Sequence, residues 1–183
     1  LPSSNCEVNE YVFDFMTHVR FLKGKKLPKR YKPDVPPSQT NLLIRHKSKN
    51  QNHNGGRERQ ARIDLGAKDE FSTLMINPDY KKRIENLKKD GRFNVCIFDD
   101  YMTHGNSFNA VRNLLEELGA NKIIFVSIGI FRSTFQKRDY KITGDVFSSN
   151  YTYEIETYQP IDNYEINENA KQEVSKLSNI FNS

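Results

Sequence analysis

The sequence predicts an α/β protein with a central, mostly parallel sheet flanked by helices. Two nearly continuous apolar runs, Phe93 to Phe98 and Lys122 to Ile130, enclose an amphipathic helix from Ser107 to Leu118. A strand, a helix and a strand in this order form the crossover that joins parallel strands. Strands that are apolar along most of their length are typical of a parallel sheet covered on both faces.

The elements before this unit follow from spacing and composition. Apolar residues at helical spacing predict a helix over residues 8–22, and the basic, proline-rich segment 23–37 predicts an exposed connection. A short apolar run at 42–44 predicts a strand. The polar stretch 48–56 is too hydrophilic to be buried, and a short helix is expected at 57–66.

The remaining elements surround the central unit. Residues 71–76 are expected to be a connection, and residues 78–89 a charged helix that ends at Asp90-Gly91. After the second strand, alternation at 140–146 and 151–158 predicts a hairpin, and apolar spacing over 166–181 predicts a last amphipathic helix.

Length and composition indicate one domain. The chain has 183 residues, which suits a single domain of residues 1–183 with a core at 1–131 and a region of uncertain role at 132–183. No apolar stretch approaches the roughly 18 residues of a spanning helix, so we expect a cytoplasmic protein without a membrane partner. Cys6 and Cys96 are far apart and predict neither a disulfide framework nor a zinc site. A first residue other than Met suggests processing or a longer parent chain.

The charge is unevenly distributed along the chain. The formal net charge is +5, but residues 1–64 carry 13 basic and 6 acidic side chains. This excess favours an anionic partner such as a nucleic acid, contacted through the basic segment 23–32, or a polyphosphate ligand. A solvated basic surface is the alternative that charge alone leaves open.

The connection after the first apolar strand carries the residues best suited to chemistry. The strand is expected to end at Asp99-Asp100, whose carboxylates can accept hydrogen bonds from a sugar diol or help to hold a divalent cation. Thr103, Gly105 and Ser107 then precede a helix N-terminus, where free N–H groups and the helix dipole favour a phosphate. A diol acceptor beside a phosphate cradle is what a ribose 5-phosphate requires. The alternatives are solvated carboxylates at a strand end or an acidic pocket of the receiver type.

The segment from Val95 to Ser107, VCIFDDYMTHGNS, resembles the phosphoribosyl pyrophosphate (PRPP) signature of type I phosphoribosyltransferases. That signature is an apolar strand, two acidic residues, two variable residues, Thr-Thr-Gly, any residue, and Ser or Thr. The match departs at His104, which stands where the family has Thr or Ser; it is interpreted as a loop residue that replaces a hydroxyl donor. The order of elements over residues 1–131 is similar to that of the ComF-like competence group of this superfamily.

The resemblance implies a phosphoribosyltransferase fold and a transfer reaction in nucleotide metabolism. PRPP would bind with Mg²⁺, with its ribose hydroxyls and the metal on Asp99 and Asp100. Its 5-phosphate would lie against the residues Thr103, His104, Gly105, Asn106 and Ser107. Its pyrophosphate would lie near Ser3, Ser4 and basic residues such as Lys47, Lys49 or Arg57, although Ser3 and Ser4 are equally well explained as helix caps. A nitrogen acceptor of unknown identity would displace pyrophosphate.

Two further functions stay open. The first is a non-catalytic module that senses PRPP or another nucleotide, or associates with nucleic acid, on the same fold, because a fold does not fix a function. The second is a nucleic-acid binder that uses Lys25, Lys26 and Lys29 and would show a steep salt dependence. A larger parent chain or an oligomer is compatible with each of these functions.

Overall fold

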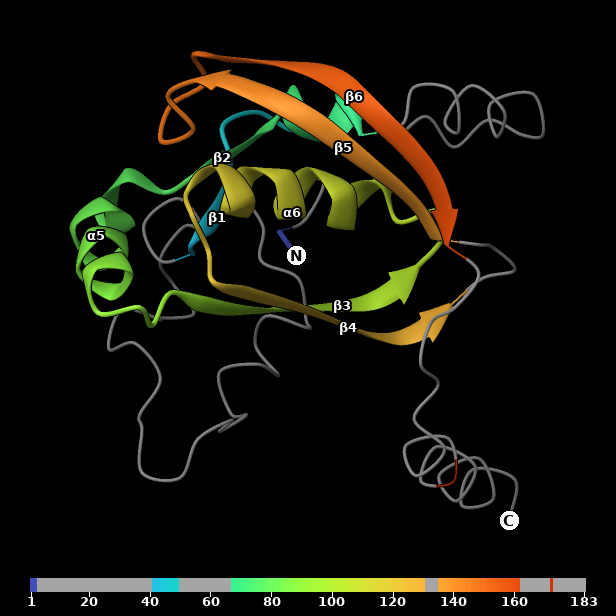
Figure 1. Ribbon diagram of the computed structural model, residues 1–183. Helices are drawn as coiled ribbons and strands as arrows, with labels where there is room; N and C mark the ends of the chain where they lie inside the picture. The colour runs from blue at the N-terminus through green and yellow to red at the C-terminus, as the bar shows by residue number, and fades with distance from the viewer. Residues whose placement is uncertain (3–40, 50–66, 131–134, 162–171, 173–183) are drawn as a thin grey trace.

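The computed structural model describes residues 1–2, 41–49, 67–130, 135–161 and 172. Within these residues the elements are β1 (Leu43–Arg45), α4 (Lys68–Phe71), β2 (Leu74–Ile76), the 3-10 helix η1 (Pro78–Tyr80), α5 (Lys81–Lys89), β3 (Asn94–Met102), α6 (Asn106–Glu117), β4 (Lys122–Ile130), β5 (Phe135–Gly144) and β6 (Tyr151–Ile161). Figure 1 shows their arrangement. The helices expected at 8–22 and 57–66 lie outside the described residues, as does the helix expected at 166–181 apart from residue 172.

The described strands form three two-stranded sheets, β1–β2, β3–β4 and β5–β6. The pair β3–β4 is parallel, with Asn94 opposite Lys122 and Met102 opposite Ile130. The other two pairs are antiparallel. The prediction of a mixed α/β fold with a parallel pair is therefore confirmed, whereas an extended central parallel sheet is not present among the described strands.

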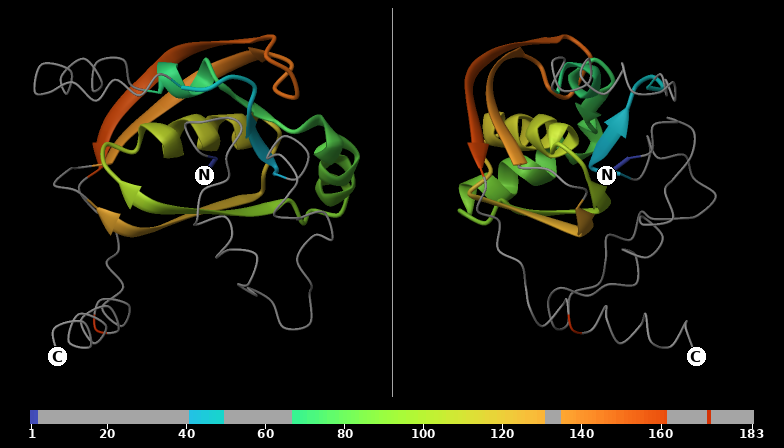
Figure 2. Two further views of the ribbon diagram at one scale, coloured as in Figure 1. Left: turned by 180° about the vertical axis from the view of Figure 1, so that it is seen from behind. Right: turned by 90° about the vertical axis from the view of Figure 1, so that its right-hand side faces the viewer.

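Helix α6 lies between two layers, the β3–β4 pair on one side and the β5–β6 hairpin on the other (Figures 1 and 2). Its residues Val111, Leu114 and Leu115 are completely buried. On the β3–β4 side, the ring of Phe108 packs against Phe125 of β4 with centroids 4.6 Å apart. The apolar stripe expected on this helix is present, and burying it supplies much of the stability of this part of the core.

The opposite side of α6 is polar, and it binds the backbone of β5. Asn109 accepts from the amide of Arg138 at 3.1 Å, and its own amide donates to the carbonyl of Gln136. Asn113 donates to the carbonyl of Arg138 at 3.0 Å and accepts from the amide of Tyr140 at 2.8 Å. Both asparagines are buried. Because these bonds pair groups on the edge of β5 that face away from β6, the hairpin is tied to α6 by hydrogen bonds.

The hairpin also packs on α4 through aromatic rings. The ring of Tyr153 stacks on Phe71 with centroids 4.7 Å apart, and Tyr140 meets the same ring edge-on. The hydroxyl of Tyr151 lies 2.7 Å from the carbonyl oxygens of both Phe71 and Leu74. These tyrosines therefore pack the hairpin against α4.

The face of the β3–β4 pair that lies away from α6 is exposed, although it was expected to be covered. Ile124, Val126 and Ile128 alternate with half-buried residues along β4, and Ile128 is 64% exposed. Cys96 on β3 is exposed as well and forms no disulfide. The expectation that both faces of these strands are covered is therefore wrong, because burial alternates along β4 as it does in a sheet with one covered face.

Candidate active site

The acidic pair lies inside strand β3 rather than after it. β3 continues to Met102, and Asp99 is paired with Ser127 of β4. Because successive side chains of a strand point to opposite faces, Asp99 lies on the α6 side and Asp100 on the other. Their exposure agrees with this, since Asp99 is half-buried and Asp100 is exposed. The two carboxylates are thus neighbours along the backbone that face different sides of the sheet.

The first residue of the chain lies beside this pair. The nitrogen of Leu1 donates to the carbonyl of Phe98 at 2.8 Å and lies 3.9 Å from Oδ1 of Asp99. Residues 1–2 therefore lie next to the part of β3 that leads into the acidic pair. Ser3 and Ser4 follow directly, but they lie outside the described residues, as does Arg57.

The carboxyl group of Asp99 has a raised pKa. Burial raises the pKa of its carboxyl to about 6, and the negative charges of Asp100 and Glu70 add to this shift. A carboxyl group with such a pKa binds a cation or a sugar hydroxyl more strongly as the pH rises above that value.

The loop between β3 and α6 contains the rest of the predicted signature. Thr103 is exposed, His104 is half-buried, and Gly105 is buried as the residue that precedes the first turn of α6. Gly105 has a φ of 76°, a left-handed conformation that favours glycine. A Cβ at this position would also collide with the ring of Phe135. The helix begins at Asn106, one residue earlier than expected, and Ser107 lies in its first turn.

A buried carboxylate from α4 contacts this first turn. The hydroxyl of Ser107 donates to Oε1 of Glu70 at 2.8 Å, and the ammonium of Lys49 donates to the same oxygen at 2.7 Å. The guanidinium of Arg45, on β1, donates to Oε2 at 2.7 Å. The side chains of Arg45 and Glu70 are 5% and 4% exposed, whereas that of Lys49 is 29% exposed. Glu70 thus links β1, Lys49 and the first turn of α6.

The charge state of Glu70 follows from these contacts. Burial by itself raises the pKa of a carboxyl group, but the positive charges of Arg45 and Lys49, and the hydrogen bonds that they donate, lower the pKa of Glu70 from 4.5 to about 2. The carboxylate is therefore ionised at neutral pH in spite of its burial. Its contacts with Arg45 form a buried ion pair, and its contact with Lys49 extends that pair toward solvent.

The sequence did not reveal Glu70. The segment 71–76 was expected to be a connection, but the structure has α4 before it and β2 within it, and both elements are very short. Their positions depend on contacts with distant parts of the chain, such as Arg45 and Tyr151. A four-residue helix has no hydrophobic period that a sequence can display, so no local signal marks Glu70 as buried.

The residues present fit a magnesium ion only in part. Within the described parts of the chain, no group of three or more His, Cys, Asp or Glu side chains is arranged to hold a metal ion. Mg²⁺ is commonly held by one or two carboxylates together with the phosphates of a substrate. Asp99, or Asp100 from the other side of the strand, fits that role with a ligand that brings its own phosphate oxygens.

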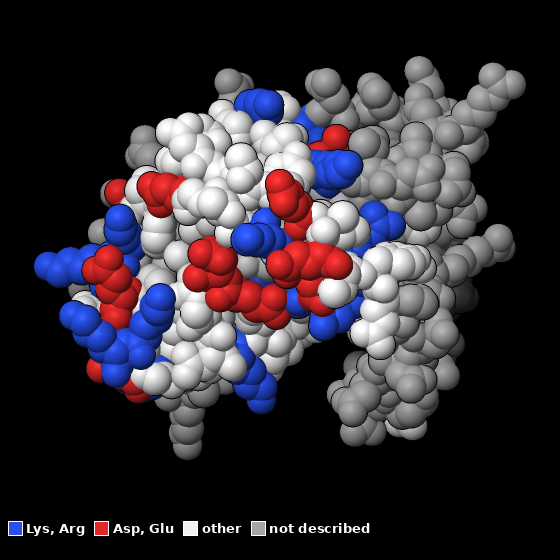
Figure 3. Space-filling model, turned by 45° about the horizontal axis from the view of Figure 1, so that its top comes forward, with Lys and Arg blue, Asp and Glu red and all other residues white. Residues whose placement is uncertain are grey.

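The visible surface charge is mixed. Figure 3 shows acidic side chains gathered beside basic ones on the face seen there. Arg112 pairs with Glu116 and with Asp139 in the described part of the chain, at 2.8 and 2.6 Å. The basic segment 23–32 lies outside the described residues. The structure therefore leaves the nucleic-acid alternative, which depends on that segment, untested.

Among the helices in the described ranges, none has both the length and the apolar character needed to cross a membrane. No protein-family model, no curated protein and no solved structure matches this chain.

Proposed function

We propose that this protein binds PRPP together with Mg²⁺ and transfers its phosphoribosyl group to a nitrogen acceptor, with release of pyrophosphate. One observation carries the proposal. The acidic pair, the glycine loop and the start of α6 follow one another in a single β–α–β unit whose two strands, β3 and β4, are parallel. In such units ligands bind outside the carboxyl ends of the strands. The glycine loop follows the carboxyl end of β3, and the acidic pair lies within the last four residues of that strand.

The residues have distinct roles in this proposal. Asp99, on the side of α6, accepts hydrogen bonds from the ribose hydroxyls, and Asp100 contributes its charge from the other side of β3. The backbone N–H groups in the first turn of α6, with the hydroxyl of Thr103, bind the 5-phosphate. His104 and Asn106 shape the loop around Gly105. Because Ser107 directs its hydroxyl to Glu70, it contributes chiefly through its backbone.

The reaction would be a substitution at the anomeric carbon. The acceptor nitrogen forms a bond to that carbon, the bond to the pyrophosphate oxygen breaks, and pyrophosphate leaves with the electron pair, while the acceptor loses its proton to solvent. Magnesium would neutralise charge on the leaving group. The protein stabilises the positive charge that develops on the sugar through the carboxylate of Asp99, provided that this group is ionised.

A test of the proposal follows the phosphorus signals of PRPP with Mg²⁺ by nuclear magnetic resonance, in the presence of ammonia or of single purine and pyrimidine bases. We expect free pyrophosphate to appear with at least one acceptor, and Asp99→Asn to slow its release by a factor of about 100 or more. Glu117→Gln, an exposed change at the end of α6, serves as the matched control.

The outcomes separate the functions. Pyrophosphate release that is equal in the wild type and in Asp99→Asn would contradict the assigned site. Binding of PRPP without turnover for any acceptor would contradict the transferase and favour the non-catalytic sensing module, which shares the ligand but not the reaction. Absence of PRPP binding would contradict both.

A further inference from the structure

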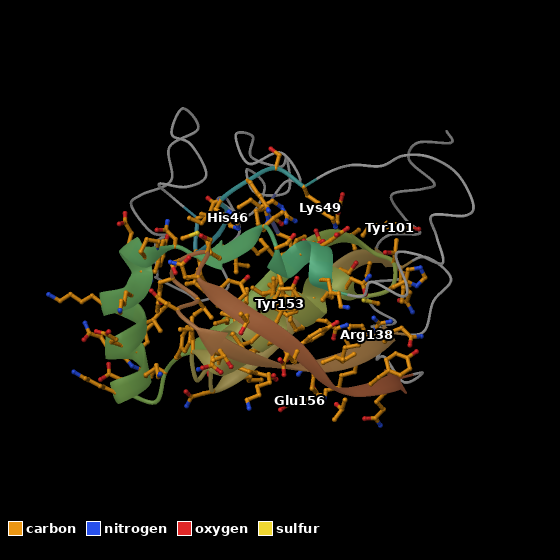
Figure 4. All side chains as sticks on the ribbon, turned by 90° about the horizontal axis from the view of Figure 1, so that it is seen from above. His46, Lys49, Tyr101, Arg138, Tyr153 and Glu156 are labelled. Atoms are coloured by element: carbon orange, nitrogen blue, oxygen red, sulfur yellow. The ribbon has the colours of Figure 1, made fainter. Side chains whose placement is uncertain are left out.

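The ammonium of Lys49 lies close to the start of α6. Nζ of Lys49 and Oγ of Ser107 contact the same oxygen of Glu70, at 2.7 and 2.8 Å, so the two groups are no more than two hydrogen-bond lengths apart. Figure 4 shows Lys49 beside α4, the helix that carries Glu70. Ser107 belongs to the first turn of α6, whose N–H groups bind the 5-phosphate in the proposed function.

The negative charge of Glu70 repels a phosphate bound at the first turn of α6. Glu70 is ionised at neutral pH, and its carboxylate accepts the hydroxyl proton of Ser107. A phosphate at the first turn of α6 therefore lies near a buried negative charge, which repels it in an interior of low dielectric constant. A neighbouring cation has to offset this repulsion if the ligand is to bind tightly.

Lys49 is better suited to that task than Arg45. The guanidinium of Arg45 is buried and donates to Oε2 of Glu70 and to the hydroxyl of Thr73. Lys49 is partly exposed to solvent, which an arriving ligand requires. An ammonium group has three N–H donors, and the bond to Glu70 uses one of them. Lys49 can therefore keep its bond to Glu70 and donate to a phosphate oxygen at the same time.

We propose that Lys49 binds the 5-phosphate of the ligand, and that Glu70 is the positioning residue that holds its ammonium at the start of α6. This inference rests on the proposed function. It differs from the role expected from the sequence, in which Lys49 is one of several basic residues near the pyrophosphate. The two roles place Lys49 at opposite ends of PRPP, so they can be distinguished with partial ligands.

The test is calorimetric titration of ribose 5-phosphate and, separately, of pyrophosphate with Mg²⁺ into the wild type, Lys49→Gln and Lys49→Arg. We expect Lys49→Gln to weaken the binding of ribose 5-phosphate about tenfold or more and to leave that of pyrophosphate within about twofold. Lys49→Arg retains the charge and is expected to recover part of the loss. Lys68→Gln removes the same charge from an exposed position on α4 and is expected to change neither affinity.

Each result bears on a separate claim. If Lys49→Gln weakens only pyrophosphate binding, or weakens ribose 5-phosphate binding no more than Lys68→Gln does, the inference is wrong and the proposed function survives. If none of the three ligands, ribose 5-phosphate, pyrophosphate and PRPP, binds measurably to the wild type, the proposed function is wrong. The role of Lys49 is then wrong as well. Unchanged thermal unfolding of the variants verifies that each of them is folded.

Discussion

Glu70→Ala is expected to lower the free energy of unfolding by about 3–5 kcal/mol. The substitution leaves the guanidinium of Arg45 buried at 5% exposure without its carboxylate, and it removes the hydrogen bonds that link α4 to Ser107 and Lys49. Loss of one partner of a buried ion pair is among the few causes of such large losses. Urea denaturation at pH 7 measures the change, and a loss below about 1 kcal/mol would show that the pair is not buried as described.

The pH dependence of stability provides a second measure of the same contacts. The pKa of Glu70 is lowered from 4.5 to about 2, so above pH 4.5 the carboxyl is ionised in both the folded and the unfolded chain and its stabilisation is complete. Between pH 4.5 and 2 the unfolded chain takes up a proton that the folded chain does not, and stability falls, by an amount on the order of 3 kcal/mol. Glu70→Gln should lack this component, whereas Glu117→Gln should retain it.

Gly105→Ala is the second substitution with a large expected effect. Alanine in the left-handed conformation costs about 1–2 kcal/mol, and the added Cβ collides with the ring of Phe135, for which overpacking adds about 1–3 kcal/mol. Because the loop precedes α6, relief of the collision moves the first turn of the helix, and ligand affinity should fall together with stability. Urea denaturation and PRPP titration measure the two effects.

Gly91 provides the matched control for this prediction. It has a φ of 64°, and a Cβ added there meets nothing within 4 Å, so Gly91→Ala carries the backbone cost alone. The difference between the two variants isolates the contact with Phe135. Equal losses in Gly91→Ala and Gly105→Ala would show that Phe135 does not constrain the loop, while a partial recovery in Gly105→Ala with Phe135→Ala would support the contact.

The elements that the sequence predicted well have long, regular patterns. The bounds of β4 agree with the expectation, and those of α6 differ by one residue at each end, since the apolar residues of each keep one period throughout. Strand β3 is longer than expected because its pairing with β4 continues through Asp99 to Met102 by backbone hydrogen bonds, which do not depend on apolar side chains. The acidic pair is consequently part of the strand.

The features that the sequence did not predict depend on distant partners. Asn109 and Asn113 are polar, yet they are buried because the edge of β5 satisfies their hydrogen bonds. Glu70, on α4, is buried because Arg45 of strand β1 balances its charge. Neither partner is close in the sequence, so no local period or composition indicates the contact. The candidate site was predicted as a segment, whereas its contacts to α4 and β1 required the structure.

The central claim is that the segment from Asp99 to Ser107 binds a ribose phosphate. It is tested most directly by calorimetric titration of PRPP with Mg²⁺ into the wild type and into the double variant Asp99→Asn/Asp100→Asn, at two salt concentrations. We predict binding by the wild type that is lost in the variant at both concentrations, because the amides keep the shape of the strand and remove its charge. Equal binding by both proteins, or affinity that disappears with salt alone, would contradict the claim.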